Sequence, residues 1–378
     1  INDALGHSIG DLLLKAIANR IRDVLPATDR VARLGGDEFA ILQMPTPQPA
    51  SAVALANEII QTASQPFRIE GHDLTVGASV GIAIGATHDV TAESLLKSAD
   101  LAMYSAKAAG RGTFRMFDPE MDSIVQAKRL LERDMRHALV HAHFSLHYQP
   151  LVNLKTKKVT AFEALMRWKH PEHGFVPPSA FIPIAEETGL IVQLGEWALR
   201  QACCDAVKWP SDVSVSVNLS PLQFLKGNLT ATVMSALATS GLDASRLELE
   251  ITESVLLDKT ERNIEILNQL RDLGARISMD DFGTGYSSIG YLRNCRFDKI
   301  KIDQSFVRDV LVDEGSLAIV RAIAGLGASF GMTTTAEGVE TEAQMRRLNI
   351  EGCVEAQGYL YSRPIPVEEV PQFLEQLS

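Results

Sequence analysis

The second half of the chain alternates short apolar runs with longer stretches in which apolar residues recur at helical spacing. Eight such runs follow residue 144, and helical patterns such as 187–207 and 316–330 lie between most of them. Strands that alternate with helices in this way predict an α/β fold, a closed barrel of the TIM type. The predicted strands are residues 145–150, 159–166, 213–219, 247–251, 276–280, 299–303, 333–336 and the short 353–355.

The connection between the first two predicted strands is unusual for such a barrel. Only residues 152–158 separate them, which is too short for a helical crossover. We therefore expect an antiparallel first strand at the start of a (β/α)8 barrel that spans residues 144–378.

The first 118 residues have a different pattern. Helical spacing covers 10–24, 51–64 and 92–108, a hairpin is expected around Gly36, and 73–84 is expected to form a strand. This mixture predicts a small α+β domain. Residues 119–143 contain apolar positions at helical spacing among many charges, so we expect a connecting helix there.

Composition narrows the class of protein. A chain of 378 residues exceeds the usual size of one hydrophobic core, so we expect two domains. Its 46% hydrophobic and 22% charged residues are typical of a globular protein. We expect no membrane span, because no apolar run approaches eighteen residues. A formal charge of −11 argues against a nucleic acid polymer as partner.

The four cysteines lack both CxxC spacing and the density of a disulfide scaffold, which favours a reducing, cytoplasmic location. The chain does not begin with Met, so we expect upstream residues. The upstream residues could include a sensor domain or an anchor at the inner face of a membrane.

All nine histidines lie at or before His173. A metal site in the last two hundred or so residues therefore needs oxygen ligands, which favours Mg²⁺ or Mn²⁺ over zinc.

Two adjacent carboxylates, Asp280 and Asp281, follow a short apolar run and precede Gly283 and Gly285. Neighbouring strand residues point to opposite faces, so both acids serve one site only if the chain turns there, which the glycines permit. Crowded carboxylates repel each other unless a cation lies between them. A helix N-cap is the alternative, and the doublet alone leaves both interpretations open.

Other predicted strands carry polar residues at or near their ends, where TIM-type barrels place their active sites. A mouth lined by carboxylates favours a pair of Mg²⁺ or Mn²⁺ ions that clamp a phosphoryl group. Lys301 fits a role in steadying charge on a phosphate oxygen, and an ion pair with Asp280 or Asp303 is its alternative. The polar residues are Glu163, Asn218, Glu250, Asp280, Asp281, Lys301 and Glu337.

Several separated motifs make residues 137–378 similar to EAL-domain cyclic-di-GMP phosphodiesterases. They include Glu163-Ala164-Leu165-Met166-Arg167, Glu250-Ile251-Thr252-Glu253 and Lys301-Ile302-Asp303. The resemblance implies hydrolysis of cyclic-di-GMP to linear pGpG by a two-metal mechanism that uses Mg²⁺ or Mn²⁺.

The resemblance also implies a role for each matching residue. One metal is expected on Glu163, Asn218, Glu250 and Asp280, and a second on Asp280, Asp281 and Glu337. Lys301, Glu337 and Asp281 are the expected catalytic residues, and the expected substrate contacts are Gln149, Leu165, Arg167 and Gln357. Glu253 and Glu340 are expected to support the loop that follows Asp281.

The first half resembles a GGDEF diguanylate cyclase domain through Arg33-Leu34-Gly35-Gly36-Asp37-Glu38-Phe39 and two flanking motifs. The resemblance implies GTP and Mg²⁺ as ligands, and the nucleotide-binding residues it predicts are Asn2, Asp11, Gly36, Asp37, Glu38, Lys107 and Arg111. The chain starts after the family's first strand, and Pro26 stands where the family's inhibitory site has Arg. We therefore expect a partial domain with a regulatory role.

Two alternatives to this assignment remain. In the first alternative, the chain is a cyclic-di-GMP receptor that does not hydrolyse its ligand and signals through the connecting helix. In the second, the protein also has diguanylate cyclase activity, if the missing upstream strand is present. Family analogy also implies a homodimer.

Overall fold

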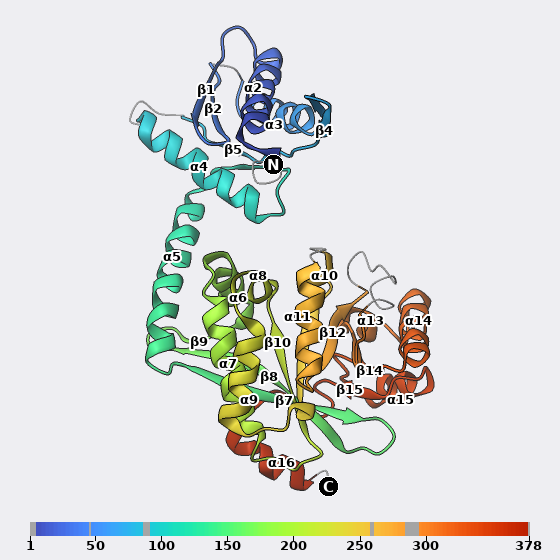
Figure 1. The fold of residues 1–378 in the computed structure, drawn as a ribbon. Coiled ribbons are helices and arrows are strands. Elements are labelled where there is room, and N and C mark those ends of the chain that lie inside the picture. Colours follow the sequence, from blue (N-terminus) through green and yellow to red (C-terminus); the bar gives the residue numbers. More distant parts are fainter. Residues whose placement is uncertain (1–4, 45–46, 86–90, 258–260, 284–294, 377–378) are drawn as a thin grey trace. The chain divides into compact units, whose positions relative to one another are not determined.

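The computed structural model describes residues 5–44, 47–85, 91–257, 261–283 and 295–376. The chain divides into two compact units, residues 1–130 and 131–378 (Figure 1). The division falls within helix α5 (Pro119–Val140), which covers most of residues 119–143, where the connecting helix was predicted. In the part of the chain that the structure describes, no helix combines the length and the apolar character needed to cross a membrane.

Among its described residues, the first unit contains helices and three separate two-stranded sheets. Strands β1 and β2 form the predicted antiparallel hairpin, and Gly36 in its turn has a positive φ of 51°. The elements are α2 (His7–Val24), β1 (Arg30–Gly35), β2 (Glu38–Leu42), α3 (Ala50–Ala63), β3 (Phe67–Ile69), β4 (His72–Leu74), β5 (Val80–Ile82), α4 (Ala92–Ala108) and β6 (Phe114–Met116).

The prediction of one strand over residues 73–84 is wrong. The structure has two short strands in this region, and each pairs with a different partner: β4 is antiparallel to β3, whereas β5 is parallel to β6. Helix α4 lies against β5 so closely that a Cβ atom on Gly81 would lie 2.0 Å from the Ala99 carbonyl oxygen. Glycine is therefore required at this helix–strand contact.

The second unit is built on a closed barrel of eight strands, as predicted. Its strands follow one another in the order β7, β8, β10, β11, β12, β13, β14 and β15, and β15 pairs with β7 to close the ring. Two short strands extend the pairing beyond the ring: β9 (Gly174–Val176) pairs with β8, and β16 (Ile365–Pro366) pairs with β7. The barrel strands are β7 (Phe144–Asn153), β8 (Val159–His170), β10 (Ser214–Leu219), β11 (Leu247–Thr252), β12 (Arg276–Phe282), β13 (Lys299–Ile302), β14 (Thr333–Ala336) and β15 (Glu355–Gln357).

The antiparallel start of the barrel is confirmed. Strand β7 is antiparallel to both β8 and β15, whereas the remaining neighbours in the ring are parallel. The Asn153 side chain accepts hydrogen bonds from the backbone N–H groups of Lys155 and Thr156, at 3.0 Å each, and this turns the chain tightly from β7 to β8.

Helices surround the barrel (Figure 1). The predicted helix over 187–207 is two helices, because Gly189 takes a left-handed conformation with φ of 77° and ends the first of them. The helical elements are α6 (Pro178–Thr188), α7 (Ile191–Ala206), α8 (Pro221–Lys226), α9 (Leu229–Ser240), η1 (Ala244–Arg246), α10 (Ser254–Leu257), α11 (Glu261–Asp272), α13 (Gln304–Arg308), α14 (Glu314–Phe330), α15 (Glu342–Ile350), η2 (Val367–Glu369) and α16 (Val370–Gln376).

The barrel strands are buried on both faces but are apolar on only one. In β13, Ile300 and Ile302 belong to the main hydrophobic core, and Gly327 of α14 lies against Ile300. The residues that alternate with them, Lys299 and Lys301, are equally buried and point into the barrel. The interior of this barrel is therefore filled largely by polar side chains, and some of them form the candidate active site.

Candidate active site

The ammonium of Lys301 lies at the centre of a group of carboxylates inside the barrel. Its Nζ atom is 2.6 Å from Glu337, 2.8 Å from Glu250, 3.2 Å from Asp280 and 3.5 Å from Glu163. The Lys301 side chain is only 1% exposed. The ion-pair alternative therefore holds for Asp280, whereas Asp303 accepts a hydrogen bond from the N–H of Ser305 at the start of α13.

The barrel topology brings these residues together. Glu163, Glu250, Lys301 and Gln357 lie on β8, β11, β13 and β15, which are alternate strands of the closed ring. In TIM-type barrels, alternate strands contribute the side chains of one interior layer. We call these four residues the upper layer.

Amide side chains hold Glu163 in place from two directions. Asn218 donates a 2.6 Å hydrogen bond to one of its carboxylate oxygens, and Gln357 donates a 2.6 Å bond to the other. Gln357 also donates to Gln149 at 3.1 Å. Burial acts to raise the pKa of Glu163, but Lys301 and the two amides outweigh burial and hold that pKa below its usual value. Glu163 is therefore ionised.

Asp280, Asp281 and Glu337 form a second group, whose ligand atoms all lie within 4.8 Å of one another. The adjacent acids reach one site because Asp281 has a positive φ of 51°, followed by Gly283 with φ of 100°. The Glu253 side chain accepts a 3.1 Å hydrogen bond from the Gly283 N–H, which ties β11 to this turn. The chain thus turns at the doublet.

The site carries more negative charge than one ammonium balances. Burial raises the pKa of Glu337 to about 8, with Asp280 adding to the shift and Lys301 opposing it. Burial and the charge of Asp280 raise the pKa of Asp281 to about 6. Burial also raises the pKa of Glu250 well above its usual value, although Lys301 opposes this. Crowded, buried carboxylates hold their protons in this way when cations are too few.

This donor set fits divalent cations. The Glu250 Oε1 atom is buried and accepts no hydrogen bond from any residue that the structure describes. Carboxylate and amide oxygens are the ligands that Mg²⁺ prefers, and a buried acceptor without a partner is costly unless a ligand meets it. The oxygen-rich site expected from the sequence is thus consistent with the structure.

The remaining predicted site residues of the barrel lie in different surroundings. Leu165 and Arg167 lie two and four positions after Glu163 on β8, so they share its face of that strand. Both side chains are half-buried. Glu340 is exposed, and its backbone N–H donates to Gln344. Glu253 and Glu340 are predicted to support the loop 281–288, of which positions 284–288 lie outside the described residues.

The described members of the predicted nucleotide-binding set in the first unit are exposed. Asp37 and Glu38 lie at the hairpin, where the Gly36 carbonyl accepts two hydrogen bonds from Arg33. Within the described ranges, no ion pair or side-chain hydrogen bond joins Asp11, Asp37, Glu38, Lys107 and Arg111 to one another. Asn2 lies outside the described residues. The nucleotide-binding role of this set therefore stays a prediction.

Comparison with known proteins agrees with the barrel geometry. The sequence model of the EAL domain matches residues 132–364. The chain belongs to the EAL-domain family. The model for the diguanylate cyclase GGDEF domain matches residues 1–113, so this EAL-domain chain has a tandem GGDEF–EAL organisation.

Two curated relatives come from Pseudomonas aeruginosa. The bifunctional diguanylate cyclase/cyclic di-GMP phosphodiesterase MucR is 43% identical over 374 residues, which are 98% of this chain and 54% of MucR. The cyclic di-GMP phosphodiesterase NbdA is 39% identical over 378 residues, which are 99% of this chain and 48% of NbdA. The chain thus spans about half the length of the curated relatives that it matches.

Solved structures of EAL-domain proteins also match this chain. The complex of the PaMucR phosphodiesterase with c-di-GMP is 44% identical, with a TM-score of 0.62, and the match covers 64% of this chain and 99% of that one. The EAL enzyme Bd1971, bound to cAMP and cyclic-di-GMP, is 32% identical with a TM-score of 0.64, and covers 77% of each chain.

Three buried, charged residues deeper in the barrel were not predicted from the sequence: Glu248, Lys299 and Glu355. Each lies two positions before an upper-layer residue on its own strand. That spacing was the available signal, because residues two apart on a strand share a face.

Proposed function

We propose that the barrel hydrolyses cyclic-di-GMP to the linear dinucleotide pGpG. The observation that carries this proposal is the buried Lys301 ammonium in contact with Glu163, Glu250, Asp280 and Glu337. The similarity to NbdA and to the c-di-GMP complex of PaMucR supports the choice of substrate.

Two divalent ions, Mg²⁺ or Mn²⁺, belong to this proposal. Glu163, Asn218, Glu250 and Asp280 would hold one ion, and Asp280, Asp281 and Glu337 would hold or approach the second. When bound, such ions polarise a phosphoryl oxygen and lower the pKa of water. The excess of carboxylates around one ammonium supports this assignment.

The protein's own residues supply the remaining chemistry. Glu337 takes a proton from the attacking water, because a carboxylate positioned beside the reacting phosphate can act as a general base. Lys301, whose pKa the surrounding carboxylates hold well above its usual value against the effect of burial, stays charged and stabilises the negative charge that develops on the phosphate. Gln149, Leu165, Arg167 and Gln357 orient the dinucleotide.

The GGDEF part has a regulatory role in this proposal. The functional division is residues 1–118 for the partial GGDEF domain, 119–143 for the connecting helix and 144–378 for the barrel. GTP bound by the first part would tune the barrel, and the protein would act as a homodimer. The four free cysteines support a location in the reducing cytoplasm.

The direct test is incubation of the chain with cyclic-di-GMP and Mn²⁺, followed by chromatography of the products. Glu163→Gln removes a charge from the centre of the site, and Glu342→Gln alters an exposed glutamate on α15 as a matched control. We expect pGpG from the wild type and from the control variant, but not from Glu163→Gln. Tight binding without turnover would instead make the chain a receptor.

A further inference from the structure

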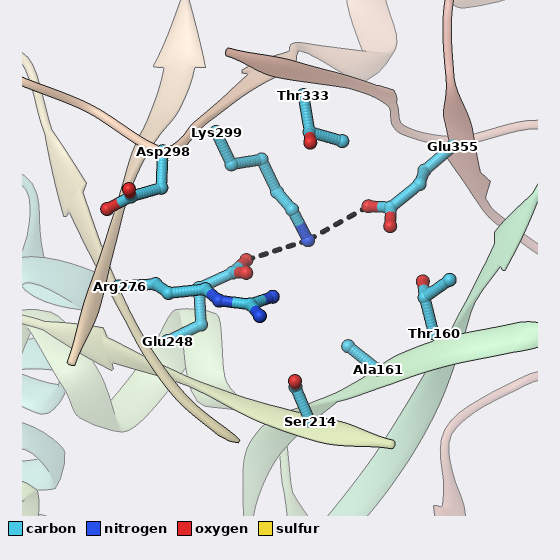
Figure 2. Close-up of a pocket in the computed structure, with 9 residues that line it drawn as sticks. All are labelled: Thr160, Ala161, Ser214, Glu248, Arg276, Asp298, Lys299, Thr333 and Glu355. Carbon is cyan, nitrogen blue, oxygen red and sulfur yellow. Dashed lines mark ion pairs between the residues drawn. The ribbon is translucent and has the colours of Figure 1, made fainter. Parts of the chain in front are cut away.

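A second buried lysine lies in the barrel beneath Lys301. The Nζ atom of Lys299 is 2.9 Å from Glu248 and 2.9 Å from Glu355, and the three side chains are 6%, 2% and 8% exposed (Figure 2). The Thr335 hydroxyl donates a further 2.9 Å hydrogen bond to Glu355. We call Glu248, Lys299 and Glu355 the lower layer.

The lower layer lies directly under the candidate active site. Each member precedes an upper-layer residue by two positions on β11, β13 or β15. Side chains two apart on a strand share a face and are separated by about 6.6 Å along it. The lower layer therefore supports the three strands that carry Glu250, Lys301 and Gln357.

Charge couples the two layers. In the lower layer, one ammonium lies between two carboxylates. In the candidate active site above the lower layer, the Lys301 ammonium contacts four carboxylates. A buried carboxylate that loses its partner is strongly unfavourable, and a lysine ammonium moves easily on its flexible stem. Without Lys299, the nearest interior cation on β13 is Lys301, two residues away.

A cavity lies beside Lys299, and a second cation, Arg276, also lines it. Figure 2 shows Arg276, at the start of β12, among the residues around Lys299. Arg276 is exposed, and no ion pair joins it to Glu248 or Glu355 within the described residues. Lys299 is therefore the cation that balances the lower layer.

We propose that Lys299 is a positioning residue for Lys301: it neutralises Glu248 and Glu355 and thereby keeps the Lys301 ammonium on the carboxylates of the upper layer. The effect of Lys299 on turnover rests on the proposed function, the hydrolysis of cyclic-di-GMP. The effect of Lys299 on cation binding does not depend on that function.

The test is Lys299→Met, which keeps the length of the side chain and removes its charge. If Lys301 is drawn towards the lower layer, kcat for cyclic-di-GMP falls about tenfold or more while KM changes less than about twofold. In the absence of substrate, Mn²⁺ binds several-fold more tightly, because the upper carboxylates lose a competing ammonium. Electron paramagnetic resonance of free Mn²⁺ measures that binding. General damage to the site would weaken Mn²⁺ binding, so the direction of the change separates positioning from disorder.

The triple variant Glu248→Gln/Lys299→Met/Glu355→Gln removes all three charges of the lower layer. It should return both kcat and Mn²⁺ affinity to within about threefold of wild type, because nothing then draws Lys301 away. Lys208→Met, which removes an exposed lysine from another surface, is the matched control. If Lys299→Met does not fold, Lys299→Met/Glu355→Gln leaves one uncompensated carboxylate and should show the same two changes at smaller size.

Three results overturn the proposal: wild-type kcat in folded Lys299→Met, weaker Mn²⁺ binding in that variant, or a triple variant that is as slow as the single one. If the wild type itself does not hydrolyse cyclic-di-GMP, the proposed function fails. The Mn²⁺ measurement still decides the role of Lys299 in that case.

Discussion

The Lys301 ammonium lies 2.6 Å from a carboxylate oxygen of Glu337, although the two residues come from different barrel strands or their ends. Glu337 follows β14, and its backbone N–H donates to the Ile302 carbonyl of β13. The contact therefore joins the candidate base to the candidate stabiliser of the phosphate. It also makes the charge state of Glu337 measurable through stability.

Glu337 should make the metal-free protein less stable as pH rises. Its pKa is raised from 4.5 to about 8, so between these values the folded protein keeps a proton that the unfolded chain has released. The free energy of unfolding, measured in a chelator, should fall over this range by at least about 1.4 kcal/mol more in wild type than in Glu337→Gln. Parallel curves for the two proteins would contradict the raised pKa.

Divalent cations should stabilise the folded chain. Mn²⁺ at one hundred times its dissociation constant is expected to add about 2.7 kcal/mol to the free energy of unfolding. Glu250→Gln should reduce this gain, because Glu250 offers a buried oxygen without a hydrogen bond. Glu342, 66% exposed on α15, supplies the control variant Glu342→Gln. Equal Mn²⁺ stabilisation of all three proteins would place the ion elsewhere.

Asp281→Asn separates charge from backbone conformation. Asparagine tolerates the positive φ of 51° at this position, so the turn should persist and the melting temperature should change little. The lost carboxylate should lower kcat by about 10² or more, as expected for a group that holds charge in the transition state. Calorimetry and steady-state kinetics on the same sample make the comparison. Near-normal turnover would remove Asp281 from the site.

A stability change without an activity change is expected from Tyr148→Phe. The buried Tyr148 hydroxyl donates a 2.8 Å hydrogen bond to Asp205 of α7, and its ring packs edge-on against Trp209. Removing the hydroxyl should cost about 1–2 kcal/mol of unfolding free energy, measured by urea denaturation. Because Asp205 lies on a helix outside the barrel, kcat should stay within about twofold of wild type.

The strands of the barrel were predictable because their apolar runs are short and separated by long helical patterns. The break at Gly189 was not, since the apolar pattern continues across it and only the left-handed conformation shows that α6 ends there. The split between β4 and β5 was hidden for a related reason: an extended pattern does not say which strand each half pairs with.

The candidate active site was largely predictable, because polar residues in apolar strands are conspicuous. Glu163, Glu250, Asp280, Lys301 and Glu337 do meet in the structure. The lower layer was missed, although Glu248, Lys299 and Glu355 each lie two positions before an upper-layer residue on the same strand face. Only the ring order of the strands brings them together.

The central claim is that the Lys301 site hydrolyses a phosphodiester bond of cyclic-di-GMP. Turnover in ¹⁸O-labelled water with Mn²⁺, followed by mass spectrometry, tests it directly, with Lys301→Met as the comparison. The account predicts pGpG that carries one heavy oxygen in its terminal phosphate, and a rate lower by about 10² or more in Lys301→Met. Cyclic-di-GMP recovered intact from the wild type, or labelled pGpG formed equally fast by Lys301→Met, would contradict it.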